Sequence, residues 1–298
     1  MGEWIDLLDP SPEELDLHLP EDVHESDLAQ LHALGASGRP GLAPHDGHIF
    51  GVLLVAVADP LGDDVYYQEI DVLLTADSLL TVRKTTPGRP AYDSTQARAA
   101  RRADDSAATC LYRLTADVAD KYLDLVDDLE QEIGELEDHV EDWKTETVSL
   151  RIRRLRHQIL HVRRTLAPMR DAIRAVADGR IDLGSEASVP REVQHEFGSV
   201  YDRLLRAADG LEMAHDLLSG ARDYYQAKVA QDQNDVIRRL TAVASILLVP
   251  TFIVGLYGQN FLATPEYHWG VWGYIWSWGW ILAVTVIQVW YFRRRRWL

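Results

Sequence analysis

The segment at residues 257–261, Tyr-Gly-Gln-Asn-Phe, stands between two long uncharged runs of the chain. A helix that ends here leaves its last backbone carbonyls without intrahelical partners, and the side chains of Gln259 and Asn260 add amide oxygens. Such oxygens suit hard cations, and Mg²⁺ gives up its water reluctantly, so contact with a hydrated ion is physically sensible. A Gly-x-Asn sequence also ends ordinary helices. It indicates an ion site here because it stands between the two uncharged runs.

The two flanking runs are long enough to cross a membrane. Residues 240–265 and 267–292 contain no Asp, Glu, Lys or Arg. Each exceeds the roughly 20 apolar residues needed to span a hydrocarbon core of about 30 Å. Two buried helices of a soluble core are the alternative, but they would need apolar partners on every side, and no other segment is so uniformly apolar. The sequence therefore predicts two spans in a lipid bilayer.

Flanking charge predicts how these spans are oriented. Arg238 and Arg239 precede the first run, and four arginines at residues 293–296 follow the second. Because cationic side chains near a span stay on the cytoplasmic side, we expect both termini inside a plasma (inner) membrane and the loop outside. Seven of the nine Trp residues fall between Trp269 and Trp297, which is typical of an aromatic belt at the membrane boundary.

Composition narrows the function classes. The formal charge is −17, and the segment from Arg238 onward carries +5, which leaves −22 upstream. This negative charge argues against a nucleic-acid partner. An acidic surface can also serve solubility alone. Because the acidic segment precedes the two predicted spans, we favour the interpretation that it attracts cations. The start of the chain lacks an apolar signal segment and Cys110 is the lone cysteine, so we expect the bulk of the chain in a reducing cytoplasm.

Catalytic signatures are missing from the sequence. It contains no nucleotide-binding loop, no Ser/His/Asp order and no Cys/His zinc spacing. The eleven histidines are scattered, and we expect them at surface or core positions rather than as metal ligands. An enzyme is therefore not expected.

The periodicity of the chain predicts an α+β cytoplasmic domain followed by long helices. In the domain at residues 1–110, the sequence favours a mixed, largely antiparallel sheet flanked by helices, with strands at 3–8, 48–58, 65–75 and 79–84 and short helices at 12–19 and 27–34. Two long antiparallel helices are expected within 111–190. A stalk helix that continues into the first span follows at 191–261, then an outer loop at 262–270, the second span at 271–292 and a basic tail at 293–298.

One stripe of the stalk helix follows alternating steps of three and four residues. Its members are Asn234, Ile237, Thr241, Ala244, Leu248, Thr251, Gly255 and Gly258. The stripe is either a tight helix contact in lipid or, with several copies around an axis, the lining of a channel. Polar Asn234 and Thr251, with apolar collars at Ile237, Leu240 and Leu248 that exclude water, favour the channel. Two spans alone enclose no aqueous pore, so the channel requires an oligomer.

With these residues in place, the chain resembles the CorA family of divalent-metal channels, which carry Tyr-Gly-Met-Asn at the end of a first span. The resemblance covers nearly the whole chain and rests on residues 4–6, Asn234, 240–241, 250–251, 257–261, 265–266, 273–274 and 293–298. It implies a homopentameric funnel whose stalk helix continues into the pore-lining span. By resemblance, Gly258, Gln259 and Asn260 form the selectivity motif, and Asn234 forms a polar ring at the inner end of the pore. The same resemblance implies that Leu240 and Leu248 form the hydrophobic gate. Asp223 then lies near the cytoplasmic mouth, and Glu266 attracts cations outside.

The sequence departs from the family pattern in two places. Gln259 replaces the motif's Met and adds an amide that can contact a hydrated ion. Ser199 stands where some members have an aspartate for regulatory Mg²⁺ between subunits, with Asp202 one turn away and Asp93 as a candidate partner.

The resemblance implies transport of a divalent cation. We expect a passive channel for Mg²⁺, with Co²⁺ or Ni²⁺ also admitted, and Mg²⁺ is a candidate regulatory ion as well as the transported one. A ZntB-like zinc transporter coupled to protons is the first alternative, because that family also varies the middle residue of the motif. The second is a membrane-anchored metal sensor that conducts no ion.

Overall fold

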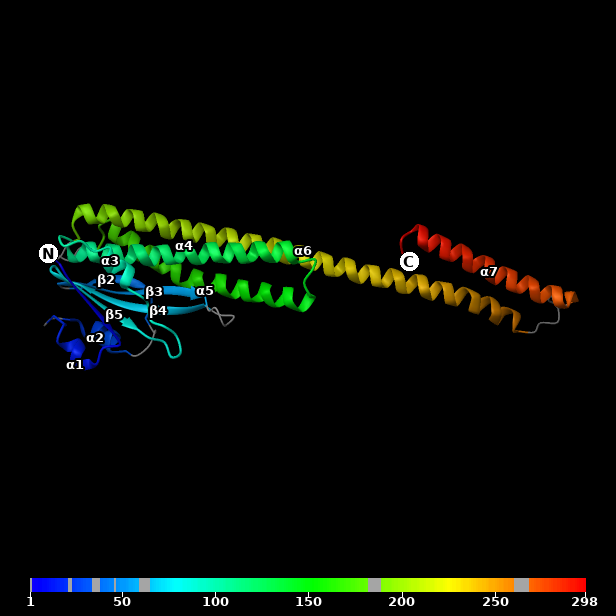
Figure 1. The fold of residues 1–298 in the computed structure, drawn as a ribbon, viewed down its shortest axis with the longest axis horizontal. Helices are drawn as coiled ribbons and strands as arrows, with labels where there is room; N and C mark the ends of the chain where they lie inside the picture. Colours follow the sequence, from blue (N-terminus) through cyan, green and yellow to red (C-terminus); the bar gives the residue numbers. More distant parts are fainter. Residues whose placement is uncertain are drawn as a thin grey trace. The chain divides into compact units, whose positions relative to one another are not determined.

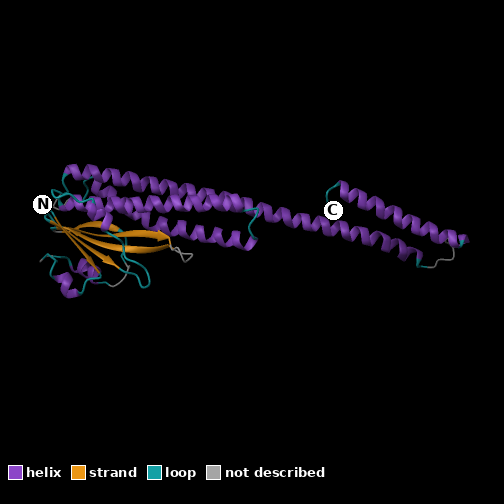
Figure 2. Ribbon diagram, in the orientation of Figure 1, coloured by secondary structure: helices purple, strands orange, loops and turns teal. Residues whose placement is uncertain are grey.

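The computed structural model describes residues 2–20, 23–33, 38–45, 47–58, 65–181, 189–259 and 268–298 (Figure 1). The chain divides into two compact units, Met1–Arg222 and Asp223–Leu298. One helix, α6, Arg191–Tyr257, contributes to both units. Strands occur in the first unit only among the described residues, as the colouring in Figure 2 makes plain.

A five-stranded sheet organises the first unit, in the order β1-β5-β4-β3-β2. The strands are β1 Glu3–Leu8, β2 Gly41–His45, β3 His48–Ala58, β4 Val65–Leu74 and β5 Ser78–Lys84. β1 pairs with β5 in parallel, and the other neighbours are antiparallel. The expected mixed, largely antiparallel sheet is therefore confirmed, with β2 as an added edge strand.

Helices cover both faces of this sheet (Figure 1). On one face lie α1, Pro12–Asp16, and α2, Glu25–His32, whose Leu15 and Leu31 pack in a core with Phe50 and Leu80. On the other face lie α4, Ala107–His139, and α5, Thr145–Ala177, while α3, Thr95–Ala99, contacts α4. The buried hydroxyl of Tyr122 on α4 donates to the carbonyl of Leu54 at 2.8 Å, which ties helix to strand.

The long helices form as their periodicity predicts. Apolar side chains recur at steps of three and four along α4 and α5 and are buried, which is the pattern of a helix with one apolar stripe. The part of α6 in the first unit packs against α4, where a Cβ on Gly210 would stand 2.8 Å from a methyl group of Val126. Glycine at that position therefore allows the two helices to approach closely.

In the second unit, α6 continues to Tyr257 through Pro250, and α7, Val271–Arg294, follows it. Both helices are long and apolar enough to cross a membrane, and only 6 % of the most apolar 18-residue window of each is buried. A core helix of a soluble protein would be mostly buried, so this exposure favours the two membrane spans. The helix expected at residues 191–261 extends over Arg191–Tyr257 in the structure, and Gly258 and Gln259 form a turn after it.

Candidate functional site

The candidate ion site begins at the C-terminal end of α6. The Gly258 N–H donates to the Val254 carbonyl at 2.9 Å, and the Gln259 N–H donates to the Leu256 carbonyl at 3.3 Å. Gly258 and Gln259 are both exposed. A Cβ on Gly258 would stand 3.3 Å from the Val254 carbonyl oxygen and 3.4 Å from that of Gly255, so glycine leaves these oxygens uncrowded.

Two further residues of this predicted site are not described by the structure. Asn260, the last residue of the selectivity motif, and Glu266 lie outside the described residues. Their roles stay predictions from the sequence.

The α6 stripe lies on the face of the helix that α7 does not cover. Ala242 is fully buried, and the Ser245 carbonyl accepts a hydrogen bond from Gln288 Nε2 of α7 at 3.2 Å. At 3.6 residues per turn, most of the stripe lies on the side of α6 away from Ala242, whereas Thr241 lies close to the Ser245 side. Its polar and apolar members are exposed, except for Ala244, which is partly buried; they are Asn234, Ile237, Thr241, Leu248, Thr251, Gly255 and Gly258. Leu240, at the edge of the stripe, is 68 % exposed. One copy of the chain therefore leaves the stripe available to neighbours.

Threonine hydroxyls along the stripe are bonded within α6. Thr241 Oγ1 donates to the Ile237 carbonyl at 2.8 Å, and Thr251 Oγ1 donates to the Leu247 carbonyl at 2.7 Å. Each hydroxyl oxygen keeps its acceptor lone pairs, so it can face water or a hydrated ion without losing that donor bond. The Thr251 bond also supports the helix next to Pro250, which has no N–H to donate.

The candidate cytoplasmic acids are exposed and lie on separate elements. Asp93 accepts hydrogen bonds from the N–H and hydroxyl of Thr95, which lower the pKa of its carboxyl. It lines a groove of about 460 Å³ with Lys121, Asp124 and Asp128 of neighbouring helix α4. Asp202 and Asp223 lie on α6. Within the single chain, the described structure does not join Asp93 to Asp202, so a site between subunits stays a prediction.

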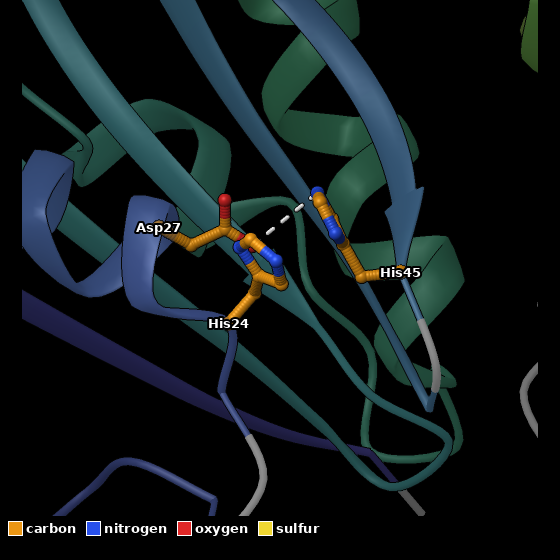
Figure 3. A group of neighbouring side chains, drawn as sticks. All are labelled: His24, Asp27 and His45. Carbon is orange, nitrogen blue, oxygen red and sulfur yellow. Dashed lines mark ion pairs between the residues drawn. The ribbon is translucent and has the colours of Figure 1, made fainter.

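A cluster of histidines that the sequence analysis did not expect lies elsewhere in the first unit. His24 and Asp27 at the start of α2 and His45 of β2 offer ligand atoms within 4.8 Å of one another (Figure 3). His48 joins them through Asp27, with its Nε2 at 3.1 Å from Oδ2. The four residues are separated in the sequence by up to 24 positions, and the fold brings them together. Only the pair His45 and His48, flanking a Gly47 turn, gave a local signal.

An α+β unit joined by one helix to two long, apolar and exposed helical segments is the architecture of a membrane protein with two candidate spans. The chain belongs to the family of CorA-like Mg²⁺ transporter proteins, whose model matches residues 2–294. Members of this family are metal ion transporters rather than enzymes, and the resemblance drawn from the sequence is confirmed.

Among its relatives is the cobalt/magnesium transport protein CorA of Thermotoga maritima, 28 % identical over 93 % of this chain and 81 % of that protein. The putative metal ion transporter YfjQ of Bacillus subtilis is 28 % identical over 99 % of this chain and 89 % of that protein. The complete CorA magnesium transporter structure from Methanocaldococcus jannaschii gives a TM-score of 0.80 at 22 % identity, covering 99 % of this chain and 91 % of that one. This likeness shows that the fold is shared along the whole chain.

Proposed function

We propose that the protein is a homopentameric channel that conducts hydrated Mg²⁺, and also Co²⁺ and Ni²⁺, into the cell. The observation that carries this proposal is the exposed α6 stripe, most of which lies on the side of the helix away from the buried Ala242. Five copies with their stripes facing a common axis would enclose a pore, whereas α7 would lie outside, towards lipid. The name of the Thermotoga maritima relative, a cobalt/magnesium transport protein, agrees with the proposed cargo.

Each part of the stripe has a proposed role along this pore. Carbonyl and amide oxygens at Gly258, Gln259 and Asn260 form the outer ring that contacts the hydrated ion. Thr251 and Thr241 supply hydroxyls, and Leu248 and Leu240 form apolar collars that close the pore by excluding water. Asn234 forms a polar ring at the inner end.

The membrane potential is sufficient to drive this uptake. Moving one elementary charge across 100 mV is worth about 2.3 kcal/mol, so a dication gains about 4.6 kcal/mol. At equilibrium that energy corresponds to roughly a two-thousandfold accumulation, since about 1.4 kcal/mol is a factor of ten. A passive channel therefore needs no coupled ion.

The test is uptake into vesicles that contain the purified protein and an indicator for Mg²⁺. We expect uptake when an inside-negative potential is imposed and its disappearance when the potential is collapsed, at equal pH on both sides. No uptake under the potential would refute the channel and leave a membrane-anchored metal sensor. Uptake of Zn²⁺ that needs a proton gradient, with no entry of Mg²⁺, would instead establish a ZntB-like transporter.

A pair of glycine variants tests where the ion passes. Gly258→Ala places a methyl group 3.3 Å from the Val254 carbonyl oxygen, which crowds the proposed ring, and we expect uptake to fall at least tenfold. Gly279→Ala in α7 is the matched control, because a Cβ there meets no atom within 4 Å. Equal loss in both variants, or none in Gly258→Ala, would contradict the proposed position of the ring.

A further inference from the structure

The first unit contains a group of side chains whose chemistry differs from that of the proposed pore. His24 is the N-cap of α2 and Asp27 lies in its first turn, while His45 and His48 face each other across the β2–β3 pair. The first three offer ligand atoms that all lie within 4.8 Å of one another, and Figure 3 shows the three side chains gathered together, with a dashed line for the ion pair between Asp27 and His45.

Asp27 is the centre of the group. Asp27 is only 4 % exposed. In the described part of the chain, its Oδ2 lies 3.4 Å from His45 Nε2 and 3.1 Å from His48 Nε2. A buried carboxylate needs a cation or several hydrogen bonds to offset its lost hydration. Neutral imidazoles supply only hydrogen bonds, whereas a metal ion bound by the same residues would supply charge.

The distances match the coordination geometry of a transition metal. Zinc–nitrogen and zinc–oxygen bonds of 2.0–2.2 Å in a tetrahedral site place neighbouring ligand atoms about 3.4 Å apart. Asp27 Oδ2 and His45 Nε2 already have this separation. His24 is exposed, so rotation of its side chain can close the remaining gap without disturbing the core.

The surroundings also orient the ligands. His24 Nδ1 lies 2.8 Å from Ser26 Oγ, and that hydroxyl donates to Asp27 Oδ1 at 3.0 Å. The Ser26 N–H also donates to His24 Nδ1 at 3.3 Å, so binding of a metal through Nε2 requires the other tautomer, in which Nδ1–H donates to Ser26 Oγ. His48 is 3 % exposed, and its Nε2–H donates to Asp27 Oδ2. Metal-binding histidines and carboxylates commonly have such supporting hydrogen bonds.

We propose that His24, Asp27 and His45 form a binding site for a transition-metal dication of the Zn²⁺, Co²⁺ and Ni²⁺ class, with His48 positioning Asp27. Two imidazoles and one carboxylate favour these ions over Mg²⁺, which prefers oxygen ligands in an octahedral shell. Water completes the coordination. The bound ion joins the start of α2 to the β2–β3 pair, and the site exists whether or not the protein conducts Mg²⁺.

The test is titration of the full-length protein in detergent with Co²⁺, after chelation and in excess Mg²⁺, which occupies sites made of oxygen alone. Visible absorption of bound Co²⁺ reports a low-coordinate nitrogen site. We expect one Co²⁺ per chain, and at least a tenfold weaker affinity in His24→Gln/His45→Gln, because lost supporting partners alone cost 10–100-fold. The control His18→Gln/His215→Gln changes two exposed histidines and should bind as the wild type does.

A second variant keeps the test independent of folding. His24→Cys replaces one ligand by another that binds Co²⁺, so it should retain binding and add near-ultraviolet thiolate-to-cobalt absorption. The appearance of this absorption band would place the bound Co²⁺ at residue 24. The proposal is overturned if wild-type protein binds no Co²⁺ in excess Mg²⁺, if the double variant binds like its control, or if the cysteine variant shows no new band.

Discussion

Lys84 of β5 provides the sharpest test of what holds α2 on the sheet. The residue is 3 % exposed, and its Nζ lies 3.0 Å from Glu69 Oε1 and 2.6 Å from Asp71 Oδ2. The same ammonium donates to the carbonyl of Gln30 in α2 at 2.6 Å. Two fully buried carboxylates and a helix carbonyl therefore share one cation. Lys84→Met keeps most of the aliphatic length and removes the charge.

The cost of this substitution follows from the burial. Removing one partner of a buried ion pair costs about 3–5 kcal/mol, because an uncompensated charge is left behind. Burial raises the pKa of Asp71 to about 7 even though Lys84 lowers it, so the loss of Lys84 must raise the pKa further. Protonation of Asp71 removes its buried charge and so reduces the loss of free energy of unfolding. The destabilisation should therefore be larger near about pH 8, where Asp71 of the wild type is ionised beside Lys84, than near about pH 5, where Asp71 is protonated with or without Lys84.

Hydrogen exchange of β4 and β5 amides in the full-length protein measures this free energy locally. After correction for intrinsic rates, about 3–5 kcal/mol corresponds to exchange roughly a hundred to several thousand times faster. Lys121→Met, at an exposed position on α4, is the matched control and should change the free energy of opening by less than about 0.5 kcal/mol. An acceleration below tenfold, or one that is equal at both pH values, would refute the reasoning.

Three other substitutions test separate parts of the structure. Asp71→Asn should flatten the pH dependence of β4 stability. The raised pKa of Asp71 makes the wild-type strand lose stability as pH rises from about 4 to about 7, and asparagine does not titrate. Hydrogen exchange that shows the same slope against pH in both proteins would contradict this. Tyr122→Phe removes the donor to Leu54 and should cost about 1 kcal/mol, measured by thermal unfolding; an unchanged midpoint would show that the bond contributes nothing. Leu248→Ser should make the pore leak ions without a stimulus in vesicle flux assays, whereas Leu282→Ser on exposed α7 should not.

Much of the fold could be predicted because its elements carry strong periodic signals. β1 and β3 begin and end where alternation and β-branched residues predict, and α6 runs over Arg191–Tyr257 because no breaker interrupts its pattern before Pro250. Pro250 itself does not end the helix, because a proline in a membrane span is tolerated when its neighbours satisfy the backbone.

The elements that sequence reasoning missed have weak local signals. β2, Gly41–His45, contains Pro44, which ordinarily argues against a strand, and it forms because an edge strand can present a residue without an N–H to solvent. α3, Thr95–Ala99, is too short for a periodic pattern. The cluster of His24, Asp27, His45 and His48 depends on how α2 docks against the β2–β3 pair, a contact that no spacing along the chain reveals.

The two candidate metal sites use opposite chemistry, and this allows one to be tested without the other. Oxygens at the end of α6 suit a dication that keeps its water, whereas the imidazoles of His24 and His45 suit an ion that exchanges water for nitrogen. If the sites are independent, His24→Gln/His45→Gln loses Co²⁺ binding in excess Mg²⁺ and retains Mg²⁺ uptake, while Gly258→Ala shows the reverse. A fall in both activities in the histidine variant, with the fold intact, would instead mean that occupancy of the first unit controls the pore, because a ligand shifts an equilibrium only through its different affinity for the two states.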